Sequence, residues 1–184
     1  MDLFTELLEE AIQELRGQKI DSEDKHFEPE IQVPVVCEIN SSLVSDTKLR
    51  LNLYRKLSNA KTDAQVDGIR EEFNDRFGEI PPETENLFAL IRIKNLLKRA
   101  GMEALSVNAL KTTFTVRKST RVELDEVMKL YTGPKGIRDP NVTLTPDSKI
   151  IYAVPFTSLQ SHTFEIEAFL KKIAPKAFEN PKSD

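Results

Sequence analysis

The sequence contains no tryptophan, one cysteine and two histidines among its 184 residues. A single cysteine, Cys37, excludes an intrachain disulfide, and an apolar residue in an extended stretch is the simplest interpretation of it. His26 and His162 lie too far apart in the sequence to provide the ligand spacing of a zinc site. The scarcity of these residue types argues against a disulfide scaffold and against a structural metal domain.

The chain also lacks any apolar run near the ~20 residues that a membrane-spanning helix needs. Its start, MDLFTELLEE, has neither the basic beginning nor the apolar core of a secretory signal. With 39% hydrophobic and 30% charged residues, the composition is typical of a soluble globular protein. We therefore expect a cytoplasmic protein with no membrane partner.

The sequence motifs of the common enzyme classes are missing. There is no G-x-x-x-x-G-K-[ST], G-x-G-x-x-G, H-E-x-x-H, C-x-x-C or G-x-S-x-G. Gly133 and Gly136 read as a turn, and His162 is expected to be an exposed residue near a helix start. The sequence therefore predicts a non-enzymatic module that holds no cofactor and no metal.

The first residues of the chain predict a helix followed by a linker. Apolar residues recur at helical spacing over 2–16, with glutamates on the other face and Gly17 just beyond. Residues 18–28 are polar and read as a linker. The chain begins inside the helical pattern, so we expect residues 1–28 to trail from an upstream module and 29–184 to form the domain proper.

The next part of the sequence predicts an extended arm and three helices. Pro29–Ile39 is rich in β-branched residues, and its prolines suit an edge strand or arm. Helices are predicted over 46–59, 62–77 and 82–100, with Asp46 and Thr62 as N-caps. Val66, Ile69, Phe73 and Phe77 form the buried stripe of the second helix, and Gly101 ends the third.

After Gly101 the pattern changes to short alternating segments. Residues 104–110 and 112–118 predict a β-hairpin, 123–131 a short helix, and 142–155 two further strands joined by a turn. A last helix is predicted over 161–173, and the tail after Pro175 is expected to be frayed. The fold class is α+β: a helical half of three to four helices, then a small, mostly antiparallel sheet with two packed helices.

Charge is unevenly distributed along the chain. Residues 1–46 hold twelve acidic and three basic residues, whereas residues 88–121 hold eight basic residues and one acidic residue. This second stretch could contact phosphates through a basic stripe. The nucleic-acid contact residues of this alternative are Arg92, Lys98, Arg99, Arg117 and Lys118. Against it, the stripe has no interleaved aromatic platform, and residues 70–86 are acidic.

Three segments of the sequence resemble one known family. They are DLFTELLEEAIQELRG, PEIQVPV, and the stretch from LRLNLYRKLSNAK through NDRFGEIPPETENLF to LLKRAGM. In order and spacing they are similar to the C-terminal domain of bacterial transcription-repair coupling factor, over residues 2–102. The loop 40–46, NSSLVSD, departs from the family pattern, which usually has a proline, an acidic residue and an aromatic residue there.

The resemblance implies a function in DNA repair. The parent protein of this family is an ATP-driven DNA translocase that removes stalled RNA polymerase and recruits nucleotide excision repair through UvrA. ATP and magnesium would be bound by motor domains that this chain lacks. The C-terminal domain would be a regulatory, autoinhibitory module that docks on the N-terminal UvrB-like module of the same parent and masks its UvrA-binding surface.

Three residues of the helix 62–77 are the predicted docking site. At 100° per residue, Glu72, Asp75 and Arg76 form one continuous flank beside the stripe that contains Phe73. Glu72 and Arg76 also form an i,i+4 pair, worth only ~0.2–0.5 kcal/mol within a helix. Stability alone therefore does not require these residue types, and a docking surface or a solvated face are the two interpretations.

Overall fold

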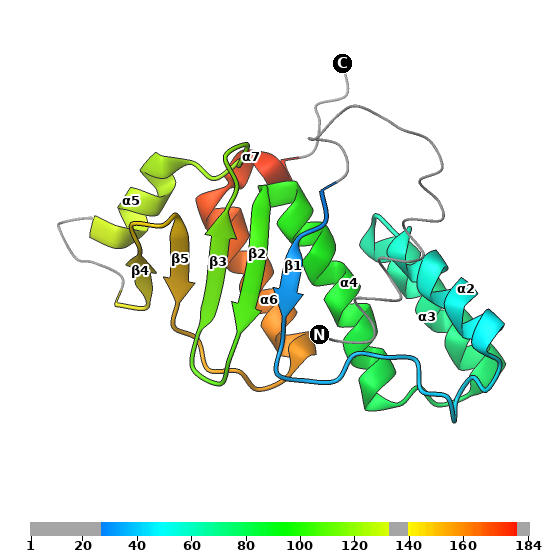
Figure 1. The fold of residues 1–184 in the computed structure, drawn as a ribbon. Coiled ribbons are helices and arrows are strands. Elements are labelled where there is room, and N and C mark those ends of the chain that lie inside the picture. Colours follow the sequence, from blue (N-terminus) through cyan, green and yellow to red (C-terminus); the bar gives the residue numbers. More distant parts are fainter. Residues whose placement is uncertain (1–26, 133–139, 180–184) are drawn as a thin grey trace, which may run out of the picture. The chain divides into compact units, whose positions relative to one another are not determined.

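The computed structural model describes residues 27–132 and 140–179. The predicted helix 2–16 and almost all of the predicted linker lie outside these residues. Within the described residues the chain divides into two compact units. The helical unit comprises residues 35–92, and the sheet unit comprises residues 27–34 and 93–179. Figure 1 shows the order of the elements along the chain.

The helical unit contains α2 (Thr47–Ser58), α3 (Asp63–Phe77) and the first half of α4 (Pro82–Ala100). All three match the predicted helices. Both predicted N-caps are confirmed, since Asp46 accepts from the Leu49 amide and Thr62 accepts from the Gln65 amide. Local cap chemistry therefore fixes where these helices begin.

Aromatic rings fill the core of the helical unit. Phe73 is fully buried, and its ring makes edge-to-face contacts with Phe77 at 5.5 Å and with Phe88 of α4 at 5.4 Å. Val66 and Ile69 complete the buried stripe of α3. The predicted stripe is thus confirmed, except that Phe77 at its end is only half-buried.

The extended arm in front of α2 is held against the first turn of α4. The Glu38 amide donates to the Glu83 carbonyl at 3.1 Å, and the Thr84 hydroxyl donates to the Glu38 carbonyl at 2.9 Å. The Ile39 amide donates to the Tyr54 hydroxyl at 2.7 Å. Cys37 lies in this extended arm, as the sequence predicts, and its side chain is buried.

The sheet unit is built on a five-stranded sheet with the order β1-β2-β3-β5-β4. The strands are β1 (Glu30–Gln32), β2 (Met102–Val107), β3 (Thr112–Val116), β4 (Val142–Leu144) and β5 (Lys149–Tyr152). The β1–β2 pair is parallel and the other pairs are antiparallel. The predicted hairpin, the mostly antiparallel sheet and the edge position of the first strand are therefore confirmed.

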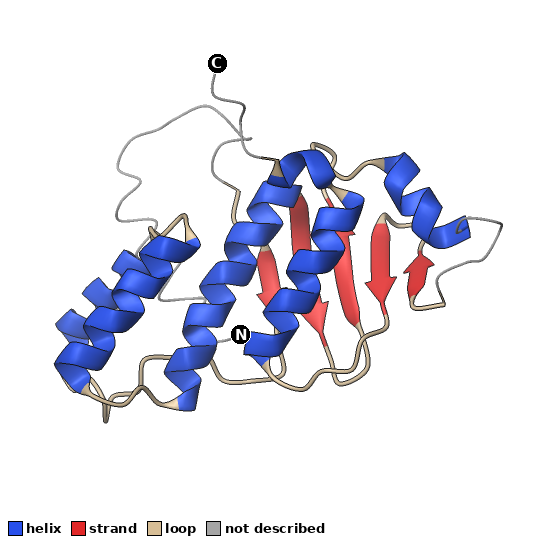
Figure 2. Ribbon diagram, turned by 180° about the vertical axis from the view of Figure 1, so that it is seen from behind, coloured by secondary structure: helices blue, strands red, loops and turns tan. Residues whose placement is uncertain are grey.

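Helices lie over one face of this sheet, as Figure 2 shows. They are α6 (Leu159–Ile173), α7 (Pro175–Phe178) and the end of α4, while α5 (Leu124–Thr132) lies at the β4 side. Phe169 of α6 stacks on Phe114 of β3 and on Tyr152 of β5, with ring centroids 5.4 and 4.4 Å apart. Alternate strand residues thus point into a layer between sheet and helices.

Two expectations about the C-terminal part are wrong. His162 was expected to be exposed, but it is 2% exposed and shares a 2.5 Å hydrogen bond with the Thr112 hydroxyl. The reason is that α6 begins at Leu159, capped by Ser158, two residues earlier than predicted. This start places His162 on the same helix face as Leu159 and Ile166, which packs against the sheet.

The expected fraying is wrong for residues 175–178, which form α7 with Ala177 buried. The Arg99 guanidinium donates to the Ala177 carbonyl at 3.2 Å and lies over the Phe178 ring at 4.7 Å. This contact from α4, far away in the sequence, holds a segment whose own length is too short to form a stable helix.

Burial of His162 predicts a pH-dependent stability. Desolvation lowers the pKa of this imidazole below its ordinary 6.5, and the nearby Glu165 carboxylate only partly opposes this shift. Below about pH 6.5 the unfolded chain gains the proton before the folded chain does, so the free energy of unfolding should fall, by at most about 1.4 kcal/mol per pH unit. The loss should stop once the pH passes the lowered folded pKa.

The measurement is urea unfolding followed by circular dichroism between pH 7.5 and pH 5.5. His162→Gln keeps a side chain that can bond Thr112 but cannot titrate, so its stability should change less over this range. An equal decline in the wild type and the variant would show that His162 is not the group responsible.

Candidate protein-docking surface

The three predicted docking residues lie together on the second half of α3. Glu72 is partly exposed, and Asp75 and Arg76 are exposed. A guanidinium nitrogen of Arg76 lies 3.1 Å from a carboxylate oxygen of Glu72, which confirms the predicted i,i+4 pair. The structure therefore brings all three charges to one flank of one helix.

The sequence did not reveal a fourth member of this group, Lys56. Its ammonium group reaches from α2 to form an ion pair with Glu72. The hydrogen bond from Lys56, followed by the one from Arg76, lowers the pKa of Glu72 below its ordinary value. Glu72 therefore stays ionised and is held between two cations at neutral pH.

Asp75 differs from its neighbours because its carboxylate makes no ion pair or hydrogen bond within the described residues. Its charge is therefore not offset inside the helical unit. A cationic group of a partner could meet this carboxylate without breaking an internal contact.

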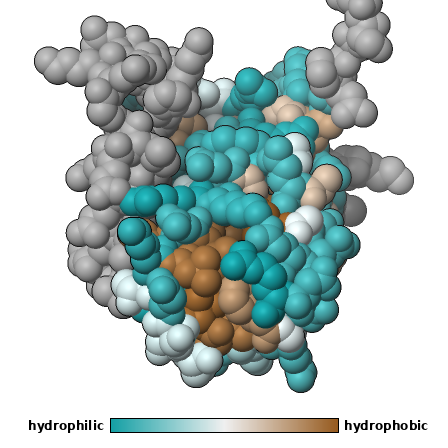
Figure 3. Space-filling model, turned by 90° about the vertical axis from the view of Figure 1, so that its right-hand side faces the viewer, coloured by the Kyte–Doolittle hydropathy of each residue, from teal (hydrophilic) through white to brown (hydrophobic). Residues whose placement is uncertain are grey.

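Apolar surface adjoins these charges. The half-buried Phe77 ring lies next to them, with the Arg76 guanidinium 5.2 Å from its centroid. On the side where α2 and α3 lie, Figure 3 shows an apolar patch surrounded by hydrophilic surface. The half-buried apolar side chains in this part of the unit are Leu43, Leu49, Leu51, Phe77 and Ile80. Apolar area rimmed by charge is typical of surfaces that bind another protein.

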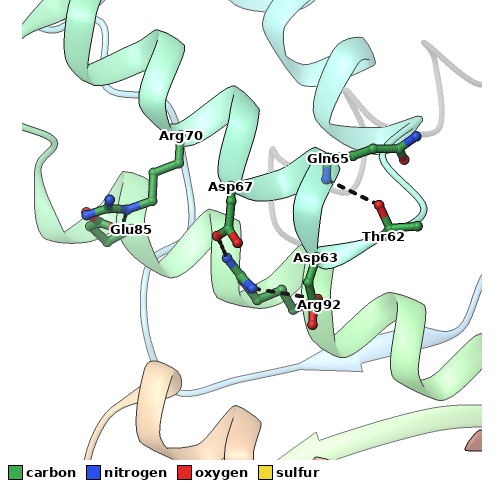
Figure 4. Close-up of polar contacts among 7 residues, drawn as sticks. All are labelled: Thr62, Asp63, Gln65, Asp67, Arg70, Glu85 and Arg92. Atoms are coloured by element: carbon green, nitrogen blue, oxygen red, sulfur yellow. Dashed lines mark hydrogen bonds and ion pairs between the residues drawn. The ribbon is translucent and has the colours of Figure 1, made fainter.

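The other side of α3 is occupied by ion pairs to α4 (Figure 4). Arg70 approaches Glu85 at 2.5 Å, and Arg92 pairs with Asp63 and Asp67. The Glu85 carboxylate raises the pKa of Arg70 above its ordinary value. On a helical wheel these residues lie about 60–120° to one side of Phe73, and the predicted docking residues lie on the opposite side. α3 is thus fixed to α4 through one flank, and its other flank carries Asp75 and Arg76.

Four of the five predicted nucleic-acid contacts are engaged within the fold. Arg92 belongs to the helical unit and is paired as described above. In the sheet unit Lys98 lies 2.8 Å from Glu28, Arg99 contacts α7, and the Arg117 guanidinium lies 3.6 Å from the Phe27 ring centroid. Lys118 is exposed. Nucleic-acid contact through these five residues stays a prediction.

The described parts of the chain offer no candidate metal site and no candidate membrane-spanning helix. Residues 27–132 and 140–179 contain no group of three or more His, Cys, Asp or Glu residues that could hold a metal ion. Within the same ranges no helix is long and apolar enough to span a membrane.

The arrangement of the chain defines a class of fold that is already known. The structure is similar to a crystal structure of the C-terminal domain of a transcription-repair coupling factor, with a TM-score of 0.59 and 16% sequence identity. The match covers 78% of this chain and 96% of that one. The α+β class predicted from the sequence is thereby confirmed.

Sequence comparison then identifies the family. The model of the TRCF domain matches residues 33–127, and the chain belongs to the transcription-repair coupling factor family. The transcription-repair-coupling factor of Myxococcus xanthus is 30% identical over 154 residues, covering 84% of this chain. That of Helicobacter pylori is 39% identical over 106 residues, covering 56% of this chain. These alignments span only 12% and 10% of the relatives' own lengths.

Proposed function

We propose that this chain is the regulatory C-terminal domain of a transcription-repair coupling factor. It docks on the N-terminal UvrB-like module of its parent, masks the UvrA-binding surface there and restrains the motor. The parent would be a cytoplasmic, ATP-dependent DNA translocase that engages stalled RNA polymerase. The domain itself would contribute binding and no chemistry, since its sequence contains none of the motifs of the common enzyme classes.

The arrangement around Glu72 is the observation that carries this proposal. Glu72 is held by Lys56 and Arg76 at the surface, and Asp75 stands beside it with its charge uncompensated. Exposed ion pairs add little to stability, typically about 0–1 kcal/mol. The group is therefore better explained by recognition than by folding, and a small charged contact can be released when the motor must act.

The test is binding of this chain to the family's N-terminal UvrB-like module by titration calorimetry. Asp75→Lys should weaken binding about tenfold or more, which corresponds to about 1.4 kcal/mol. Arg76→Glu and Glu72→Lys should do the same. Asp75→Lys is the most informative variant because it breaks no internal ion pair. Its free energy of unfolding should therefore stay within about 0.5 kcal/mol of that of the wild type.

Lys118→Glu is the matched control, because it reverses an exposed charge in the sheet unit. Its affinity should equal that of the wild type. If the three α3 variants also bind as the wild type does, the docking surface is wrongly assigned. If the wild-type chain does not bind the module at all, the proposed function itself fails.

A further inference from the structure

Gly68 lies in the interior of α3, where the fold of the described residues does not require a glycine. It does not have the positive φ of Gly78 and Gly101. A Cβ at this position would meet nothing within 4 Å outside its own helix. Glycine within a helix is less favourable than alanine, because its unfolded backbone has more conformational freedom to lose. Alanine would therefore suit the fold better at this position.

Gly68 belongs to the flank of α3 that carries the proposed docking residues. On the helical wheel centred on Phe73, Gly68 lies at about −140°, between Glu72 at about −100° and Asp75 at about −160°. It is exposed, and it precedes Glu72 by one helical turn. The flank therefore contains a stretch of bare helix backbone directly beside its charged side chains.

Two longer side chains next to Gly68 on this flank are held away from it. The side-chain oxygen of Gln65 accepts from the Lys61 amide at 2.6 Å, which directs this side chain toward the start of α3. The Glu72 carboxylate pairs with Arg76, one turn further along, which directs it toward the end of the helix. These neighbours therefore do not fill the surface over Gly68.

We propose that Gly68 is the point at which the main chain of the docking partner approaches α3 most closely. This inference rests on the proposed function, because the partner is a segment of the N-terminal UvrB-like module. The separation of two packed segments depends on the side chains at their contact, so a missing side chain lets the two backbones come closer. Glycine is the residue that permits such an approach.

The charge next to this glycine agrees with a close approach. Asp75 lies two turns further along the same flank, and its carboxylate makes no ion pair within the described residues. An aspartate side chain is short, so a cation of the partner can meet it only if the partner lies close to the helix. Gly68 would then select a partner by the space it leaves, and Asp75 would select it by charge.

The experiment is titration calorimetry of the complete 184-residue chain against the family's N-terminal UvrB-like module, with side chains of increasing size at position 68. Gly68→Ala should weaken binding about three- to tenfold and Gly68→Leu about a hundredfold, because each added group pushes the partner away. Gly68→Ala should also raise the midpoint of thermal unfolding by about 1–4 °C. Partial unfolding cannot explain weaker binding by a more stable variant.

The matched control is Ala168→Leu, which enlarges an exposed small residue of α6 in the sheet unit and should leave the affinity unchanged. If Asp75→Lys weakens binding but both Gly68 variants bind as the wild type does, the inference about Gly68 is wrong and the docking surface stands. If the wild-type chain does not bind the module, the proposed function fails and this inference fails with it. A molar mass of the free chain that falls on Gly68→Leu substitution, in analytical ultracentrifugation, would identify a second copy as the occupant and overturn the inference.

Discussion

Replacement of Phe73 by alanine is expected to lower the free energy of unfolding by about 3–5 kcal/mol. Phe73 is fully buried, and its ring is in edge contact with both Phe77 and Phe88, so the change removes apolar burial and leaves a cavity between α3 and α4. A loss of this size is a large fraction of the roughly 5–15 kcal/mol by which domains are stable. Urea unfolding of the complete chain followed by circular dichroism measures it.

Phe164→Ala is the matched control for this prediction. The ring of Phe164 on α6 is 71% exposed, so its removal should change stability by less than about 0.5 kcal/mol. Similar losses for the two variants would contradict the burial of Phe73 between the helices.

Replacement of Gly101 by alanine is expected to cost about 2–5 kcal/mol. Gly101 ends α4 with φ of +74°, a conformation that costs other residues about 1–2 kcal/mol. A Cβ at this position would lie 2.8 Å from the Thr120 Cα and 3.1 Å from the Arg121 amide nitrogen. Overpacking of this kind typically adds about 1–3 kcal/mol.

The opposing backbone cannot easily move away from that Cβ. The Arg121 amide donates to the Ala100 carbonyl at 3.0 Å, and the Arg117 amide donates to the Gly101 carbonyl at 3.2 Å. The close approach of residues 117–121 is therefore part of how α4 is tied to the segment after β3. Shifting this segment would break these hydrogen bonds.

Gly78→Ala separates the two contributions to the cost of Gly101→Ala, which are backbone conformation and overpacking. Gly78 ends α3 with φ of +80°, but a Cβ there would meet nothing within 4 Å. Its cost should come from backbone conformation alone and be smaller than that of Gly101→Ala by about 1–3 kcal/mol. Thermal unfolding of both variants at one pH provides the comparison, and equal costs would show that the close approach at Gly101 does not matter.

Most of the elements could be predicted from the sequence because their causes are local. Asp46 and Thr62 cap the helices that follow them, and the 3.6-residue stripe through Phe73 marks the buried face of α3. The alternation in residues 104–118 predicts the hairpin that β2 and β3 form. Each signal acts over a few residues, so it is visible before any packing is known.

The candidate site was only partly predictable. The positions of Glu72, Asp75 and Arg76 on one flank follow from helical periodicity, and the structure brings them together as predicted. The ion pair with Lys56 does not follow, because it joins residues 16 positions apart on two different helices. That these residues dock on another protein stays a prediction.

Internal use of the basic residues was likewise invisible in the sequence. Arg99 reads as a cation suited to the end of a helix, but in the structure it also holds a carbonyl 78 residues away. Arg117 reads as a possible phosphate contact, but its guanidinium lies over the Phe27 ring. Counting charged residues along the sequence cannot show which of them make contacts within the folded chain.

The sequence by itself determined the family, the order and type of the elements, and the helix caps, because periodicity and capping depend on neighbouring residues. Only the tertiary structure decided that His162 is buried against Thr112 and that residues 175–178 form a helix. It also decided which charged side chains form ion pairs or other contacts within the fold. The physical reason is that burial and ion pairing depend on distances between segments, which are set only when the helices and the sheet pack.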